Sequence, residues 1–143
     1  MAFENPSREA IKQLLMNTRT IAVVGLSDKP DRTSYMVSEA MQAKGYRIIP
    51  VNPNANGPIL GEKVYGSLTE IEEPVDIVDV FRRSEDIGPI AEETVRMKHK
   101  PKAFWLQQGI VNEEAGQVVA EQGIQVIMDR CIKVEDSILL PKK

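Results

Sequence analysis

The chain has 143 residues, the size of one ordinary domain, and its 42% hydrophobic and 27% charged content is typical of a globular protein. A formal net charge of −3 argues against general binding to nucleic acid or to an anionic membrane, because such binding needs a clustered excess of Lys and Arg. One cysteine, Cys131, and one histidine, His99, exclude an internal disulfide and a conventional His/Cys zinc site.

Targeting and membrane signals are also absent from the sequence. No apolar run approaches the roughly 20 residues of a membrane span. The first residues lack the basic and then apolar order of a signal peptide. We therefore expect a cytoplasmic protein without a bound structural metal, in which residues 1–143 form a single domain.

Apolar runs alternate with segments of helical spacing along the first half of the chain. The capping signal Asn5-Pro6-Ser7 predicts a first helix. A strand is predicted at 20–25, then a helix that Thr33 or Ser34 caps and that ends before Gly45, then a strand at 47–51. Residues 54–74 are irregular and rich in Gly and Pro, with an extended piece at 63–65 and a helical turn at 68–71.

The second half repeats this alternation. A strand at 75–81 precedes a helix capped by Ser84, a strand at 101–106 precedes a helix capped by Asn112, and a fifth strand covers 124–128. The tail from 129 to 143 has no strong period. Alternating strands and helices predict a Rossmann-like, doubly wound α/β fold. Its sheet is expected to be mainly parallel, with five to six strands and helices on both faces.

Ligands of such folds bind outside the carboxyl ends of the strands, where the connection order switches. The first junction at that edge, residues 25–34, leads into a helix N-terminus, whose free N–H groups attract anions. Gly25 allows a sharp backbone turn, and further donors and positive charge come from Ser27, Lys29, Arg32 and Ser34. This pattern indicates a phosphate site, and an ordinary solvated loop is the alternative interpretation.

The second junction argues against NAD. A Rossmann dehydrogenase carries Asp or Glu at the end of its second strand, to bind the ribose 2′-hydroxyl. Here that end reads Val51-Asn52-Pro53, and the G-x-G-x-x-G fingerprint is also missing. Asn52 and Pro53 could contact an adenine ring, or they could simply form a rigid turn.

The last two junctions add polar side chains at the same edge. Arg82 and Arg83 follow the third strand and can bind phosphate oxygens, unless they are only solvated surface charges. After the fourth strand, Gln107 offers both a donor and an acceptor, and Gly109 allows close backbone approach. Cys131 follows the fifth strand, either as a small buried hydrophobe or as a thiol that exchanges with a ligand thiol.

Together these junctions resemble the small stand-alone CoA-binding proteins, which are related to the nucleotide-binding domain of the succinyl-CoA synthetase α subunit. The resemblance covers about residues 10–135. The segments that carry it are Ile21 to Ser27, Lys29 to Arg32, Val51 to Pro53, Val80 to Arg82, Trp105 to Gly109 and Met128 to Ile132.

The resemblance implies coenzyme A or an acyl-CoA as the ligand. It places Gly25, Ser27, Lys29 and Arg32 by the phosphates, with Ser34 in the same junction. Asn52, Pro53, Val80 and Phe81 would form the adenine side, Arg82 would approach phosphate or ribose, and Gln107 and Gly109 would lie toward the pantetheine arm. The synthetases also use a phosphohistidine in a further domain, for which this sequence has no matching histidine.

We therefore expect a CoA-binding module without catalysis of its own and without catalytic residues. One alternative is a thiol-exchange or acyl-transfer enzyme that uses Cys131. Another is an NADP-binding regulatory domain, in which Arg32 or Arg82 would take the 2′-phosphate. The expected partners are the CoA ligand and either a second copy of the chain, with 54–74 as a contact surface, or an acyl-CoA enzyme.

Overall fold

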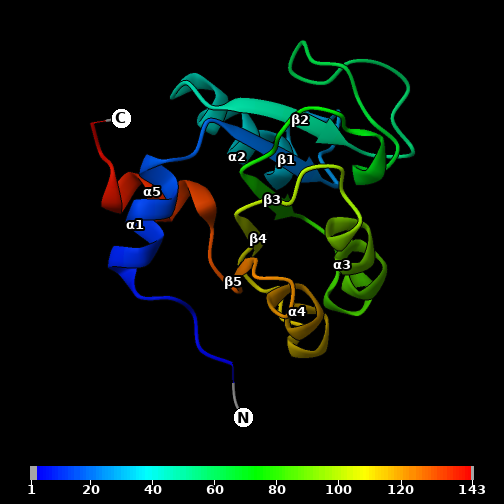
Figure 1. The fold of residues 1–143 in the computed structure, drawn as a ribbon. Coiled ribbons are helices and arrows are strands. Elements are labelled where there is room, and N and C mark those ends of the chain that lie inside the picture. Colours follow the sequence, from blue (N-terminus) through cyan, green and yellow to red (C-terminus); the bar gives the residue numbers. More distant parts are fainter. Residues whose placement is uncertain (1–2, 143) are drawn as a thin grey trace.

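Five parallel strands form a single sheet in the computed structural model, which describes residues 3–142 (Figure 1). The strands are β1 (Thr20–Val24), β2 (Arg47–Val51), β3 (Ile77–Val80), β4 (Ala103–Leu106) and β5 (Gln125–Ile127). Their order across the sheet is β2-β1-β3-β4-β5. This confirms the predicted Rossmann-like α/β fold, at the lower of the two expected strand numbers.

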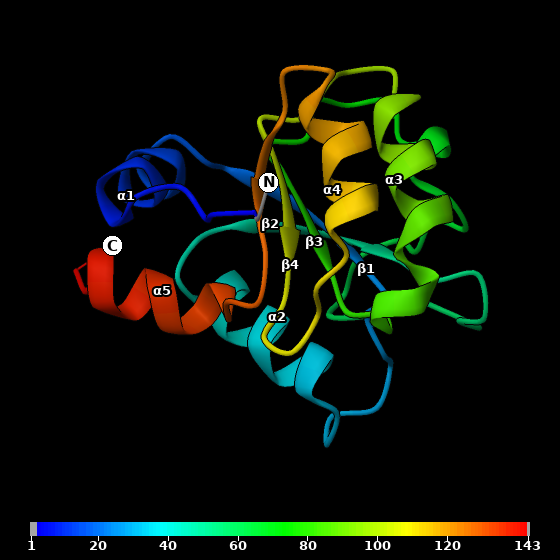
Figure 2. The ribbon, with the colours of Figure 1, turned by 90° about the horizontal axis from the view of Figure 1, so that it is seen from below.

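Helices cover both faces of the sheet, as Figure 2 shows from its edge. One face carries α1 (Arg8–Met16), α2 (Thr33–Ala43) and α5 (Ile132–Leu139), and the other carries α3 (Ile87–Val95) and α4 (Glu113–Ala120). Two short 3-10 turns, η1 (Leu68–Glu70) and η2 (Ser84–Asp86), complete the regular structure of the described residues. None of these helices combines the length and the apolar character that crossing a bilayer requires.

Each strand contributes to two hydrophobic cores, because successive side chains point to opposite faces of the sheet. Val78, Val80 and Phe104 pack in the core under α3 and α4. Ile77 and Trp105 belong to the core under α1, α2 and α5. The strands are buried on both faces, which explains why they read as continuous apolar runs in the sequence.

Two predicted helix caps are wrong. The cap residue of α2 is Arg32, without a side-chain cap bond, and the Ser34 hydroxyl instead accepts the N–H of Ser27 at 3.0 Å. Ser84 opens η2 rather than capping α3, and its hydroxyl accepts the N–H of Val111 at 3.0 Å. Both serines therefore hold loops at the carboxyl edge of the sheet together. The predicted Asn112 cap is confirmed by its bond from the Ala115 N–H.

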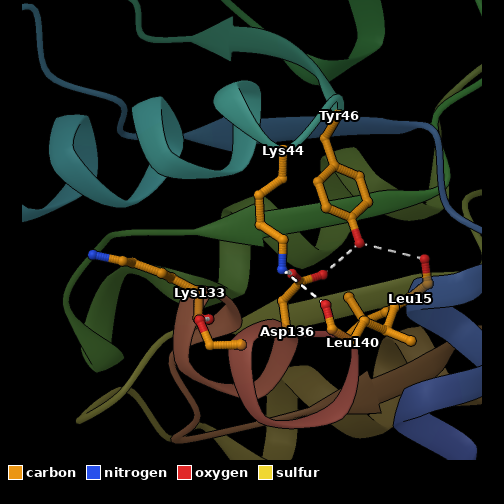
Figure 3. Close-up of polar contacts among 7 residues, drawn as sticks. Leu15, Lys44, Tyr46, Lys133, Asp136 and Leu140 are labelled. Carbon is orange, nitrogen blue, oxygen red and sulfur yellow. Dashed lines mark hydrogen bonds and ion pairs between the residues drawn. The ribbon is translucent and has the colours of Figure 1, made fainter. Parts of the chain in front are cut away.

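Helix α5 lies in the tail for which the sequence predicted no period. Its buried face includes two acids, Glu135 and Asp136, which break the apolar pattern of a covered helix. Asp136 is fully buried, and it pairs with the Lys44 ammonium and accepts the Tyr46 hydroxyl (Figure 3). Lys44 also donates to the Leu140 carbonyl at 3.1 Å. This network fastens α5 to the end of α2.

The sheet changes winding direction between β1 and β3. The chain leaves β1 toward α2 on one face and leaves β3 toward α3 on the other face (Figure 2). The connections from β1 to α2 and from β3 to α3 therefore diverge to opposite faces at the carboxyl ends of two neighbouring strands. In doubly wound folds this arrangement opens a crevice at the carboxyl edge, where ligands bind.

Candidate functional site

A groove runs over the carboxyl ends of the strands, where the sheet changes winding direction between β1 and β3. It consists of two hollows of about 410 and 1110 Å³, which share Thr33 and Phe81 as lining residues. We call the smaller hollow the cradle, the larger one the long cavity, and the two together the switch-point groove. Their combined size suits an extended ligand that carries a polar head group.

The cradle is built by the loop between β1 and α2. It is lined by Gly25, Ser27, Lys29, Arg32, Thr33, Ser34 and Phe81. The Ser27 hydroxyl accepts the N–H of Lys29 at 3.1 Å, and the Ser34 hydroxyl accepts the N–H of Ser27 at 3.0 Å. These bonds fold the loop back onto the first turn of α2. Thr33 and Ser34 of that turn line the cradle, so an anion in it would lie at a helix N-terminus, where it would be stabilised.

The cations that line the cradle form no ion pair with the described residues, although the exposed Asp28 and Asp31 stand next to them in the same loop. Lys29 and Arg32 are exposed, and neither side chain forms an ion pair within residues 3–142. Arg82 at the end of β3 is likewise exposed and unpaired in the described part of the chain. Three cations are thus available to a ligand at one edge of the sheet.

The neighbouring Arg83 differs from Arg82. Its guanidinium contacts the Asp86 carboxylate at 3.0 Å. This bond raises the pKa of Arg83 above its usual value. Although Arg83 also lines the long cavity, its charge is partly satisfied within its own turn. The sequence offered two equivalent arginines, and the structure distinguishes Arg82 as the one without a protein partner.

The long cavity is lined by an amide, Gln107, and by a thiol, Cys131. Gln107 is 4% exposed, lines this cavity, and accepts the Ile132 N–H at 3.0 Å through Oε1. Cys131, half-buried, lines the same cavity at the cap position of α5. Sequence reasoning left the role of Cys131 open, and the structure brings it to the same cavity as Gln107 and Arg82.

Gly109 shapes the rim rather than the wall of this cavity. It has φ +85° and donates its N–H to the Asp129 carboxylate at 2.7 Å. Its neighbours Gln108 and Ile110 line the cavity, whereas Gly109 does not. The glycine therefore shapes the loop after β4, and its expected contact with a ligand stays a prediction.

Two expected adenine-side residues lie in a separate hollow of about 610 Å³. Asn52 and Pro53 line it together with residues of the irregular segment, including Lys63. The Asn52 amide donates to the Leu26 carbonyl at 2.9 Å, and its oxygen accepts the Asn54 N–H at 2.9 Å. The Asn52 side chain is thus engaged by the protein and links the turn after β2 to the loop after β1.

The remaining expected contact, Val80, is fully buried in the core under α3 and α4. Only its backbone reaches the edge, where its carbonyl accepts the Gln107 N–H at 3.3 Å. Of the twelve residues expected at a ligand, eight line the switch-point groove: Gly25, Ser27, Lys29, Arg32, Ser34, Phe81, Arg82 and Gln107. Thr33 and Ile110 also line the groove. Ile110 could not be predicted as a site residue, because the sequence criteria selected polar residues and glycines.

Within residues 3–142, no group of three or more His, Cys, Asp and Glu side chains is placed to hold a metal ion. Two of the three acids that line the long cavity, Asp86 and Glu93, have protein partners, whereas Glu85 forms no hydrogen bond or ion pair with the described residues. Glu93, for example, accepts the Ser67 hydroxyl at 2.7 Å and the Leu68 N–H at 3.0 Å, and so fixes η1 against α3.

Comparison with known proteins agrees with this geometry. The profile of the family described as CoA binding domain matches residues 19–137. The uncharacterized protein YneT of Bacillus subtilis (strain 168) is 55% identical over 135 residues, which are 94% of this chain and 98% of that protein.

Two solved structures share the fold along nearly their whole length. Cell-free ID.343 from Thermus thermophilus has a TM-score of 0.89 at 35% identity, with 94% of this chain and 100% of that chain covered. A hypothetical protein from Pyrococcus horikoshii OT3 has a TM-score of 0.88 at 30% identity, covering 98% and 99% of the two chains.

Proposed function

The chain belongs to the CoA binding domain family, and on that premise we propose that its switch-point groove binds coenzyme A or an acyl-CoA. The observation that carries the proposal is a set of three exposed cations at the switch-point groove that form no ion pair within residues 3–142. Lys29 and Arg32 lie at the cradle, and Arg82 lies at the entrance to the long cavity. This set offers fixed donors and net positive charge to a polyphosphate.

The shape of the groove supports the same ligand class. Coenzyme A combines a pyrophosphate and a 3′-phosphate with a long, thin pantetheine arm. The cradle would take the phosphates at the first turn of α2. The long cavity, which continues past Phe81 to Gln107 and Cys131, would take the arm.

The end of β2 supports CoA over NAD. NAD-binding domains of this type place an acid there for the ribose 2′-hydroxyl. This chain has Asn52, whose amide is engaged with Leu26 and Asn54. Binding itself is the proposed activity, with no turnover of the ligand by the bound chain.

A ligand panel tests the proposal. The unfolding temperature is measured with saturating CoA, acetyl-CoA, NAD, NADP or ATP. A ligand at about 100 times its Kd should add about 2.7 kcal/mol to the free energy of unfolding. We expect CoA or acetyl-CoA to raise the unfolding temperature by several degrees. A rise with NADP but none with either CoA species would favour the NADP-binding alternative and refute the proposal.

A further inference from the structure

The long cavity is lined by an uncommitted donor and by a thiol. Gln107 uses its Oε1 to accept the Ile132 N–H at the start of α5. Its other end, Nε2, has no hydrogen-bond partner among residues 3–142, although the residue is only 4% exposed and lines the cavity. A buried amide held at one end in this way presents its N–H donors to whatever fills the cavity.

The loop before α5 holds Cys131 on the same cavity wall. Trp105 donates its indole N–H to the Arg130 carbonyl at 2.8 Å, and Asp129 accepts the Gly109 N–H. The thiol that follows makes no hydrogen bond within the described residues and does not cap α5. The backbone of this loop is therefore fixed from β4 while the sulfur stays available to a ligand.

The division of the groove into two hollows matches the two parts of coenzyme A. The cradle carries the phosphate-binding features, Thr33 and Phe81 line both hollows, and Arg82, Gln107 and Cys131 line only the long cavity. A ligand whose phosphates occupy the cradle would direct its arm toward the long cavity. The arm carries amide carbonyls that accept hydrogen bonds, and it ends in sulfur.

We propose that Cys131 exchanges with a disulfide of CoA and holds the coenzyme covalently in the groove, with Gln107 as a positioning residue that donates to an arm carbonyl. The inference rests on the proposed function. The Cys131 thiolate attacks the sulfur of the bound CoA moiety, so that the S–S bond of the ligand breaks and a Cys131–S–S–CoA bond forms. The leaving thiolate takes up the proton that Cys131 released. The disulfide ligand is the oxidant, so the step balances without another reagent.

The experiment measures selectivity, because any accessible cysteine reacts slowly with disulfides. The reduced protein is mixed, without oxygen, with CoA disulfide or with glutathione disulfide, and adducts are followed by intact-mass spectrometry. We expect one CoA adduct, reversed by dithiothreitol, that forms roughly tenfold faster than the glutathione adduct because binding raises the local concentration. In urea-unfolded protein the two rates should converge.

Substitutions connect the reaction to the groove. Arg82→Ala should slow the reaction with CoA disulfide more than the reaction with glutathione disulfide, and so lower the ratio of the two rates. The same change at Arg19, which directly precedes β1 at the opposite edge of the sheet, should alter neither rate. Gln107→Glu keeps the acceptor for Ile132 and loses the donor, and it should lower the ratio of the two rates. Equal rates in the folded protein, or no effect of Arg82→Ala, would overturn the inference.

The two proposals fail in different ways. Cys131→Ser cannot form the adduct, but it should still bind reduced CoA in a calorimetric titration. If it binds CoA while wild type shows no preference for CoA disulfide, only the covalent step is wrong. If neither protein binds reduced CoA, the proposed function itself is wrong.

Discussion

Gly25 packs directly against the backbone of Phe81, so that a Cβ atom on Gly25 would lie 2.4 Å from the Phe81 carbonyl oxygen. The two residues directly follow the neighbouring strands β1 and β3, and the Phe81 N–H donates to the Val24 carbonyl at 2.9 Å. Gly25 also has φ +83°. The strand ends can approach this closely only where a residue without a side chain turns the backbone into the cradle.

Gly25→Ala should destabilise the fold and weaken ligand binding. The new methyl group meets backbone rather than a flexible side chain, and the left-handed conformation adds strain of about 1–3 kcal/mol. Urea unfolding should show a loss of at least that size. The matched control is Gly88→Ala in α3, where a Cβ would meet no atom within 4 Å. An unchanged unfolding midpoint for Gly25→Ala would contradict the close packing.

Asp79 should make stability fall as pH rises. Its carboxyl lies in β3 opposite Val23 and Trp105, is fully buried, and has no partner for Oδ1 in the described residues. Burial raises the pKa of Asp79 well above the ordinary value of 3.8. The folded state therefore keeps its proton where the unfolded chain releases it. The free energy of unfolding decreases between pH 3.8 and the raised pKa of the folded state.

The variant Asp79→Asn tests this dependence, because an amide has no proton to lose. The stability of the variant relative to wild type should increase from pH 4 to pH 8, as measured by chemical unfolding at each pH. A difference that stays constant over this range would show that the Asp79 carboxyl does not titrate abnormally in the folded protein.

Tyr46→Phe should loosen α5. Its hydroxyl donates to the buried Asp136 carboxylate, and burial, followed by this bond, raises the pKa of Tyr46 (Figure 3). Loss of the donor leaves one carboxylate oxygen without that partner, which costs about 1–3 kcal/mol. Amide exchange should accelerate most in α5. Tyr35→Phe is the control, because its half-buried hydroxyl makes no hydrogen bond in the described chain. Equal effects of the two variants would count against the anchoring role.

Most of the fold was predictable because its strands are buried on both faces and appear as largely apolar runs, with Asp79 of β3 as a buried exception. Helix α5 was not, because Glu135 and Asp136 occupy its covered side and only a tertiary contact with Tyr46 and Lys44 explains one of them. The Thr33/Ser34 cap failed for a similar reason, since Ser34 bonds to Ser27 across the loop. The sequence does not reveal these contacts. Asp136 is far from Tyr46 and Lys44 in the chain, and either Thr33 or Ser34 could have capped the helix.

The site was predictable at the level of junctions rather than of individual side chains. The carboxyl edge follows from the fold class, so Arg32 and Arg82 could be placed there in advance. The sequence could not show that Arg83 is paired with Asp86 or that Val80 points into the core. It also left Cys131 between two interpretations, because cavity lining depends on how α5 packs against the sheet.

The central claim is that the switch-point groove binds coenzyme A, and a calorimetric titration with three proteins tests it most directly. CoA is titrated into wild type, Arg82→Ala and Arg19→Ala, which lose the same charge at opposite edges of the sheet. We predict saturable 1:1 binding to wild type and Arg19→Ala, with a Kd for Arg82→Ala raised roughly tenfold or more, as expected for loss of a charged hydrogen bond. Absence of binding to wild type, or equal affinities for all three proteins, would contradict the account.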